Sequence, residues 1–418
     1  MTSRTGSGWL FGLLLATFVI GTDDFIIAGI LPTIAAHFQV TEAAAGQLVT
    51  AFSITYAVAA PIMAVATARL PRKVLITGGL AVFALINFLT ALAPNYPVLM
   101  TLRVLAALVA ATVSPAAFAI AGSLASPERI GRAIGTVAAG LTVSLVLGVP
   151  IGSWLGGRFG WQATFLAVGA FTCLVVVITS LTLPRIPSMP VAGVRARLAL
   201  LRRPAVLLCV VGTTIGACAG LMTYTYIAPI MHDLTGAGSA AVPVFIVVMG
   251  VSGALGTVLG GRLTDRWGVD RTLLASFGGV LLATAGLAVA GRVTGGDAPV
   301  WVAGVLLVLW GLSAWGNNPP MTSRILHLAG AAATEAVALN TSALYVGVGL
   351  AGAIGGGALS RSGGSGVLLA GAVIGLITIV VMAIAVSRYP TRAQPLDLDA
   401  SVKVIASAHA HGAGDEDR

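Results

Sequence analysis

Twelve apolar stretches of about 20 residues constrain the fold of this 418-residue chain more than any other feature. A helix of that length crosses the hydrocarbon core of a bilayer. Only 9% of the residues are charged and 57% are hydrophobic, a composition that a soluble domain could not bury. We therefore predict an all-α integral membrane protein with twelve transmembrane helices. The stretches are 9–36, 43–67, 74–93, 97–121, 133–156, 163–182, 204–230, 242–261, 272–291, 300–322, 337–359 and 367–387.

Basic residues are distributed unevenly between the segments that join these helices. If both termini are cytoplasmic, 19 of the 23 lysines and arginines fall in inner segments and only Arg158, Arg292 and Arg361 fall in outer loops. This bias follows the positive-inside rule, so we predict a multi-pass protein of the bacterial cytoplasmic (inner) membrane with both termini cytoplasmic. Scattered basic residues facing an anionic leaflet also explain the net charge of +9, and we expect no nucleic-acid partner.

The longest inner loop, 184–203, divides the twelve helices six and six. It carries three prolines and five arginines, and a short basic motif recurs after the second helix (69–73) and after the eighth (261–268). Two pseudo-symmetric six-helix bundles with substrate between them are a design of large secondary transporters. The predicted parts are an N-terminal bundle (1–183), a cytoplasmic linker (184–203), a C-terminal bundle (204–387) and a disordered cytoplasmic tail (388–418).

Two adjacent acids, Asp23 and Asp24, lie within the first apolar stretch, which contains no other charge. A carboxylate at that depth costs about 2.5–3.5 kcal/mol, so an acid there indicates a function. Asp24 shares a helix face with Thr17, Gly21 and Ala28, a small and polar stripe that can line a cavity, whereas Asp23 has mainly apolar neighbours. We predict that both belong to a proton-coupling site and that Asp24 is the better proton carrier. The alternative is that either acid only holds the bundle together.

Arg103 is the only cation within the predicted spans. Burial disfavours an ionised carboxylate and a nearby cation favours it, so a site that alternates between water and a partner can bind and release a proton. We therefore place Arg103 with Asp23 and Asp24 in the proton-coupling site. In the alternative, Arg103 extends to the outer headgroups and takes no part.

Glycines recur along one face of the fifth helix. Gly140, Gly148, Gly152 and Gly156 form a ridge that permits close packing, and Pro150 removes a backbone hydrogen bond and can bend the helix. Taken alone, such spacing is common in packed membrane helices.

These features resemble the major facilitator superfamily, and within it the twelve-helix drug/proton antiporters related to chloramphenicol-resistance and sugar-efflux permeases. The first helix carries Gly21-Thr-Asp-Asp24-Phe25, which places Asp24 where that branch has its acid, and Arg103 stands at the family's arginine position. The resemblance implies that the motif Gly140…Gly148-Val-Pro150-Ile-Gly152 is the antiporter motif, which distinguishes exporters from importers.

Two positions depart from the family pattern. The usual Gln-Gly after the arginine reads Ala106-Ala107, and the acidic position of the loop after the second helix is Ala68. An acidic-basic pair survives only as Asp265-Arg266 in the second half. We therefore place an inner gate at this pair, which would bond to neighbouring helix ends; the alternative is ordinary solvated loop charge.

Aromatic and amide side chains in the seventh, tenth and eleventh helices are the candidate substrate contacts. They suit a neutral amphipathic guest, although tryptophan and tyrosine also favour interfacial positions. We also expect the tenth helix to break near its inner end, at Asn318-Pro319-Pro320. The predicted contacts are Tyr224, Tyr226, Trp315, Asn317, Asn318 and Asn340.

The predicted function is a proton-coupled secondary transporter that exports a small, largely neutral compound, with chloramphenicol-like drugs and hence antibiotic resistance among the possibilities. We expect a monomer with no cofactor other than protons and no metal site, including at His409 and His411 in the tail. The sequence has no Walker loop, metal-ligand cluster or nucleophile elbow, so we do not predict an enzyme. The alternatives are a sugar or nucleoside exporter or facilitator, and a membrane sensor or receptor.

Overall fold

The computed structural model describes residues 8–126, 129–186 and 194–391, and every regular element in these ranges is a helix. Ten long helices or helix pairs each supply one membrane span, and α16 supplies two because it bends at Ser362 and Gly363. The predicted all-α fold of twelve transmembrane helices is confirmed. The predicted tail beyond residue 391, with His409 and His411, lies outside the described residues.

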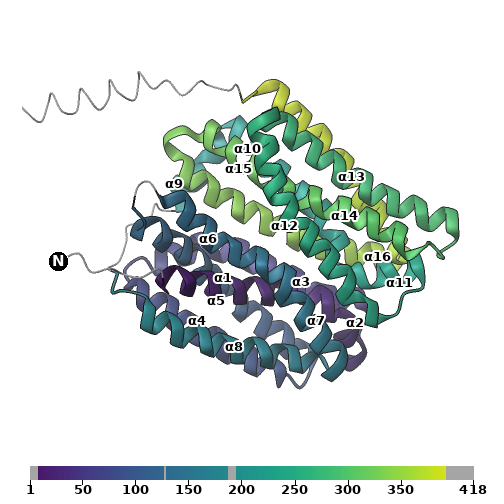
Figure 1. Ribbon diagram of the computed structural model, residues 1–418, viewed down its shortest axis with the longest axis horizontal. Coiled ribbons are helices and arrows are strands. Elements are labelled where there is room, and N and C mark those ends of the chain that lie inside the picture. Colours follow the sequence, from purple (N-terminus) through teal and green to yellow (C-terminus); the bar gives the residue numbers. More distant parts are fainter. Residues whose placement is uncertain (1–7, 127–128, 187–193, 392–418) are drawn as a thin grey trace, which may run out of the picture.

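The N-terminal bundle lies in the lower part of Figure 1, coloured purple to teal. Its first span is α1 and α2, and its fifth is α6, a π-helical turn and α7. Its elements are α1 (Gly8–Phe25), α2 (Ile27–Phe38), α3 (Glu42–Ala66), α4 (Arg72–Ala91), α5 (Tyr96–Leu124), α6 (Ile130–Val143), the π turn (Ser144–Gly148), α7 (Val149–Phe159) and α8 (Trp161–Thr182).

The C-terminal bundle lies in the upper part of Figure 1, coloured green to yellow. It follows the short linker helix α9 (Val194–Ala199) and the turn Leu200–Arg202. Its elements are α10 (Pro204–Thr225), α11 (Ile227–Thr235), the turn Ser239–Ala241, α12 (Val242–Trp267), α13 (Val269–Thr294), α14 (Val300–Gly316), α15 (Asn318–Ala329), the turn Gly330–Ala332 and α16 (Ala333–Arg388).

Each interrupted span has a proline just after its break, although Pro61 in α3 and Pro115 in α5 lie inside unbroken helices. Because proline has no N–H, the carbonyl four residues before it loses its helical partner. The breaks between α1 and α2, between α10 and α11, and between α14 and α15 each come shortly before a proline, and so does the π turn. The last break falls at Asn317, near the middle of the span rather than near its inner end, because the helix continues to Ala329, beyond the apolar stretch. The prolines are Pro32, Pro229, Pro319 with Pro320, and Pro150.

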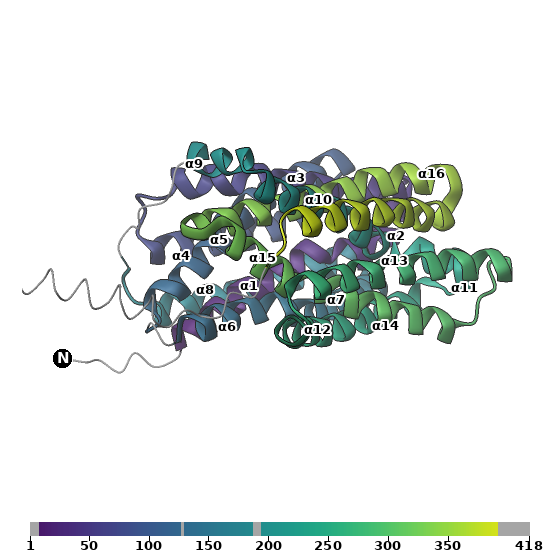
Figure 2. The ribbon, with the colours of Figure 1, turned by 90° about the horizontal axis from the view of Figure 1, so that it is seen from above.

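The bundles meet along two seams, α3 with α16 and α7 with α12 (Figure 2). We call the side where α1 begins and α16 ends the terminal side, and the opposite side the far side (Figure 1). Within the described ranges, all hydrogen bonds between the bundles lie between the middle of the membrane span and the far side. Gln47 donates to the Gly352 carbonyl at 3.2 Å, Thr50 donates to the Gly349 carbonyl at 3.0 Å, and Tyr345 forms the third, central bond. The protein is therefore closed on its far side.

Candidate functional site

Asp23 and Asp24 form the last turn of α1, just before the break at Ile26. Their side chains are 1% and 4% exposed, so both acids are buried within the part of the chain that would cross the bilayer. Adjacent residues on a helix point about 100° apart, and the two carboxylates accordingly have different partners. The structure separates their roles in a way that the sequence pattern does not.

Asp23 forms a buried ion pair with Arg103 of α5. The Arg103 Nη1 donates to Asp23 Oδ2 at 2.7 Å, and Nη2 donates to the Asp23 backbone carbonyl at 3.1 Å. The Arg103 guanidinium also lies 4.4 Å from the centre of the Phe52 ring, and Arg103 is only 1% exposed. Arg103 therefore does not extend to the headgroups. The acid that accepts its hydrogen bonds is Asp23 and not Asp24.

Asp24 has a neutral partner from the other bundle. The hydroxyl of Tyr345, in α16, donates to Asp24 Oδ2 at 2.9 Å. The Tyr345 ring stacks on Tyr56 of α3, with 3.8 Å between the ring centres. The sequence analysis did not identify either tyrosine. Their positions in the sequence could have identified them. Both lie well inside apolar spans, away from the membrane interfaces that tyrosine prefers.

A small cavity of about 10 Å³ lies beside Asp24, enough for about one water molecule. Both bundles line it, and within the described chain the buried Tyr224 hydroxyl at its edge has no hydrogen-bond partner. Ala28 and Thr225 are two of the residues that line the cavity. Their backbone carbonyls lack the usual helical donor four residues later, because Pro32 and Pro229 have no N–H. The site therefore offers polar groups to a small guest. The lining residues are Asp24, Phe25, Ala28, Val49, Leu221, Tyr224, Thr225 and Val348.

An aromatic cluster adjoins this cavity. Tyr224 is in contact with Phe25 at 5.6 Å between ring centres, with Trp310 at 6.3 Å and with Trp315 at 6.0 Å. Trp310 is fully buried, whereas Trp315 is partly exposed. The structure thus brings together Tyr224 and Trp315 from the predicted substrate contacts and adds Trp310 and Phe25.

The other predicted substrate contacts lie apart from this cluster. Tyr226 is fully buried at the far-side seam, where its hydroxyl donates to the Gly352 carbonyl at 2.5 Å. Asn340 accepts a hydrogen bond from Thr213 at 2.6 Å, and Asn317 donates to the Ala314 carbonyl at 2.9 Å. Asn318 is exposed at the start of α15. In this conformation the cluster beside Asp24 is therefore smaller than the predicted set.

The glycine ridge of the fifth span packs against the helices that carry and follow the acids. A Cβ atom at Gly140 would collide with Thr17 and the Leu14 carbonyl, and one at Gly148 would collide with Thr22. Gly152 and Gly156 continue the contact along α2, against Ile26 and Ile30. Because small residues allow such close approach in a membrane, the ridge holds the fifth span against the first.

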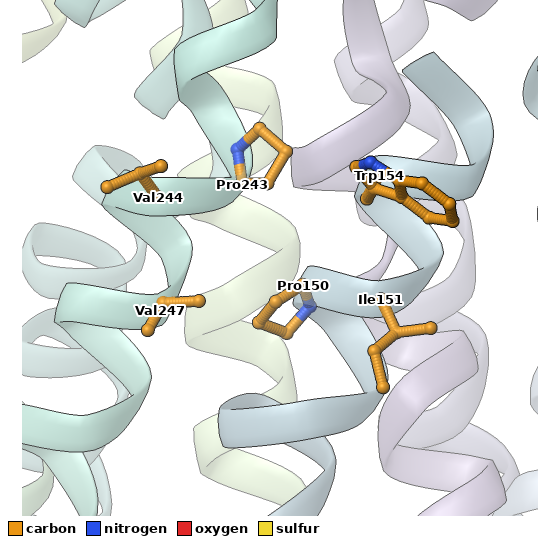
Figure 3. A pocket seen from close by; sticks show the side chains of 6 residues that line it. All are labelled: Pro150, Ile151, Trp154, Pro243, Val244 and Val247. Atoms are coloured by element: carbon orange, nitrogen blue, oxygen red, sulfur yellow. The ribbon is translucent and has the colours of Figure 1, made fainter. Parts of the chain in front are cut away.

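Pro150 faces the second seam. It lines an apolar groove of about 260 Å³ between α7 and α12, opposite Pro243 (Figure 3). Trp154 and Val244 of this groove are 56% and 60% exposed, so the groove opens on the membrane-facing perimeter. The fifth span around Pro150 therefore packs against the first span on one face and against the other bundle on another. The remaining lining residues are Ile151 and Val247.

The predicted inner gate, Asp265 with Arg266, is not formed among the described residues in this conformation, which is closed on the opposite side. Asp265 and Arg266 are exposed in the last turn of α12, and neither forms an ion pair or hydrogen bond with any described residue. The helix extends past the apolar stretch, so these residues are not in a loop. On this side the ion pair joins Asp270 and Arg324.

Arg324 lies beyond the tenth apolar stretch, 300–322, and so is one of the basic residues that the sequence places in inner segments, but it is fully buried in α15. It donates to the carbonyls of Ala385 and Tyr389 at 2.8 and 2.7 Å, and Asp270 accepts from the Thr391 amide at 2.8 Å. This cluster ties the end of α16 to α13 and α15 within the C-terminal bundle.

Comparison with known proteins gives consistent results. A sequence model of the family described as "Major Facilitator Superfamily" matches residues 13–335. The chain is 30% identical to the inner membrane transport protein YdhP of Escherichia coli (strain K12), covering 91% of this chain and 96% of that protein. It is 34% identical to a chloramphenicol resistance protein of Streptomyces lividans, covering 81% and 86%. Among solved structures, a bacterial homologue of the human lysosomal transporter Spinster, described as inward-facing and occupied, matches with a TM-score of 0.70, 19% identity and coverage of 93% and 96%.

Proposed function

Since the chain belongs to the Major Facilitator Superfamily and is a multi-pass membrane transporter, we propose that it exports a small, amphipathic, largely neutral compound in exchange for protons. The observation that carries this proposal is the Asp24 carboxylate, buried where the two bundles meet and hydrogen-bonded to a neutral hydroxyl. A buried acid at such a junction can change its charge as the bundles move, which is what proton coupling requires.

The neighbours of the two acids favour Asp24 as the proton carrier. Protonation of Asp23 would leave the buried Arg103 guanidinium without a counter-charge, and a buried unpaired charge is strongly destabilising. The partner of Asp24 is the uncharged Tyr345 hydroxyl, so protonation there strands no cation. Asp23 and Arg103 then form a permanent pair beside the acid that titrates.

The side chains around Asp24 favour a neutral guest. Tyr224, Phe25 and Trp315 supply aromatic faces, and among the described residues the one ion pair nearby joins Asp23 to Arg103. A multiply charged substrate would have no counter-ions among the described residues around Asp24 and would lose its hydration without compensation. The chloramphenicol resistance protein is a relative whose name fits such a guest. A chloramphenicol-like compound is therefore the first candidate.

The closed far side and the predicted orientation are compatible with export. The bundles are joined by hydrogen bonds on the far side, and with cytoplasmic termini the site would open to the cytoplasm, where an exporter collects its substrate. A proton motive force of roughly 150 mV supplies ~3.5 kcal/mol per proton, enough for about a few-hundredfold gradient of a neutral compound. We infer a monomer in the bacterial inner membrane, with protons as the only coupling ion.

The test is drug accumulation in a sensitive bacterial host. Expression should lower the internal concentration of chloramphenicol, and an uncoupler should abolish the difference. Asp24→Asn keeps the size of the side chain but cannot exchange a proton, so it should remove uptake of drug into inverted vesicles against a gradient. Accumulation that is unchanged by the uncoupler would contradict proton coupling.

The rival functions are separated by reconstitution. Vesicles containing a pH-sensitive dye and an imposed pH gradient are screened with drugs, sugars and nucleosides. A sugar or nucleoside that drives proton movement would replace the drug as substrate, and passive flux would indicate a facilitator. Ligand binding without any flux would indicate a sensor or receptor.

A further inference from the structure

The seam between α3 and α16 has a regular antiparallel register. Gln47 pairs with Gly352, Thr50 with Gly349, and Tyr56 with Tyr345, so the partners run in opposite directions along α3 and α16. A Cβ atom at Gly352 would collide with Thr50, so glycine is required for this close approach. Of these three pairs, the tyrosine pair lies nearest the terminal side.

Tyr345 joins this seam to the acid of the first span. Its ring contacts α3 through Tyr56, and its hydroxyl donates to Asp24 of α1, so a single side chain of the C-terminal bundle contacts two helices of the N-terminal bundle. Tyr56 is 2% exposed, which leaves the stacked ring little freedom. Tyr345 thus connects the seam directly to the Asp24 carboxylate.

Few of the charged and titratable groups in the described part of the chain lie around Asp24. Arg103 faces it from α5 but is bonded to Asp23, the neighbour of Asp24 on α1. The remaining groups are tyrosine hydroxyls. A hydroxyl that donates to a carboxylate forms a bond about twice as strong as one to a neutral acceptor, so protonation of Asp24 weakens its bond to Tyr345. The tyrosines are Tyr56 from α3, Tyr224 from α10 and Tyr345 from α16.

We propose that Tyr345 is a positioning residue for transport: its bond to ionised Asp24 holds the empty carrier closed on the far side until a proton or substrate releases it. This inference rests on the proposed proton-coupled export. An antiporter must change conformation when it carries a proton or a substrate and must not do so when empty, because an empty carrier that moves lets substrate leak back. The Asp24–Tyr345 bond meets that requirement, since it is strongest when the site is empty and the acid is ionised.

The test measures the far-side opening directly. Spin labels are attached at Leu92→Cys, at the end of α4, and Val293→Cys, near the end of α13, in a variant without native cysteines. Both positions are on the far side and are 74% and 80% exposed. Distances between the labels are recorded by pulsed electron paramagnetic resonance in nanodiscs at about pH 5 and about pH 9, a range in which a buried carboxyl can titrate.

The parent protein should show mainly short distances at the higher pH and a larger open fraction at the lower pH. Tyr345→Phe keeps the stacked ring but removes the hydroxyl, so at the higher pH its open-to-closed ratio should rise about tenfold or more and its pH dependence should be lost. Tyr96→Phe is the matched control, because the Tyr96 hydroxyl donates to the Ala44 carbonyl within the N-terminal bundle. It should keep the parent pH response.

The outcomes separate this proposal from the proposed function. If Tyr345→Phe retains the parent pH response, the latch is wrong, whatever Asp24 does. If Asp24→Asn retains that response as well, the titrating acid is another group and proton coupling through Asp24 also fails. If Tyr96→Phe behaves like Tyr345→Phe, the effect is a general loss of packing and overturns the latch. Support requires that the double variant Asp24→Asn/Tyr345→Phe matches Asp24→Asn alone.

Discussion

The Asp23–Arg103 pair predicts an asymmetry between two single substitutions. Asp23→Leu leaves the guanidinium buried without a counter-charge, and arginine cannot lose its proton at accessible pH. Because both side chains are only 1% exposed, removal of the acid should lower the free energy of unfolding by about 3–5 kcal/mol at any pH. Arg103→Met leaves a carboxyl instead, and a carboxyl can take up a proton and become neutral. Each unit of pH decrease should therefore recover about 1.4 kcal/mol in Arg103→Met.

The assay is unfolding by sodium dodecyl sulfate in mixed micelles, followed by tryptophan fluorescence at about pH 5 and about pH 7. The change between the two pH values in the parent protein, to which Asp24 contributes, is subtracted from that of each variant. The remaining change in the free energy of unfolding should be about 3 kcal/mol for Arg103→Met and close to zero for Asp23→Leu. The double variant Asp23→Leu/Arg103→Met removes both charges and should be more stable than Asp23→Leu alone, as for other buried pairs replaced by apolar residues. Equal loss in both single variants at both pH values, or no recovery in the double variant, would refute the assignment of Arg103 to Asp23.

Two further predictions concern packing and the terminal side. Gly148→Val should lower the free energy of unfolding by about 1–3 kcal/mol because it collides with Thr22, whereas Gly157→Val meets open space and should be neutral in the same micelle assay. Arg324→Met should cost about 3 kcal/mol by stranding its buried partners, but Asp265→Asn, at an exposed position, should change stability by less than about 0.5 kcal/mol. A large effect of Asp265→Asn on stability would contradict its placement outside the buried cluster.

The helices and their number were predictable because each apolar stretch is its own signal. The depth of Asp23, Asp24 and Arg103 follows from position along those stretches. Which acid contacts Arg103 does not, because adjacent residues differ by about 100° around the helix and the rotation of α1 is set by its neighbours. The glycine ridge of the fifth span fixes that rotation by contact with Thr17 and Thr22, which only the folded structure shows.

Arg324 illustrates a second limit. The tenth apolar stretch ends at residue 322, so a basic residue just beyond it was assigned to an inner segment. In the structure α15 continues to Ala329, and the guanidinium is buried because Asp270 and two carbonyls at the end of α16 accept its hydrogen bonds. Tyr345 was not predicted either, because its hydrogen-bond partner Asp24 is 321 residues away in the chain. In both cases the contact exists only in the folded structure.

The first span of each bundle is interrupted at an equivalent position, but the residue just before the break differs chemically between the two bundles. Asp24 lies two residues before the break at Ile26, and Tyr224 lies two residues before the corresponding break at Tyr226. The two side chains line the same cavity from opposite bundles. The repeated break therefore brings an equivalent position of each half to the centre, and the sequence places an acid on one side and an aromatic hydroxyl on the other. Under the proposed function, a proton site and a wall for a neutral guest then lie beside each other, so that movement of one bundle against the other alters both at once.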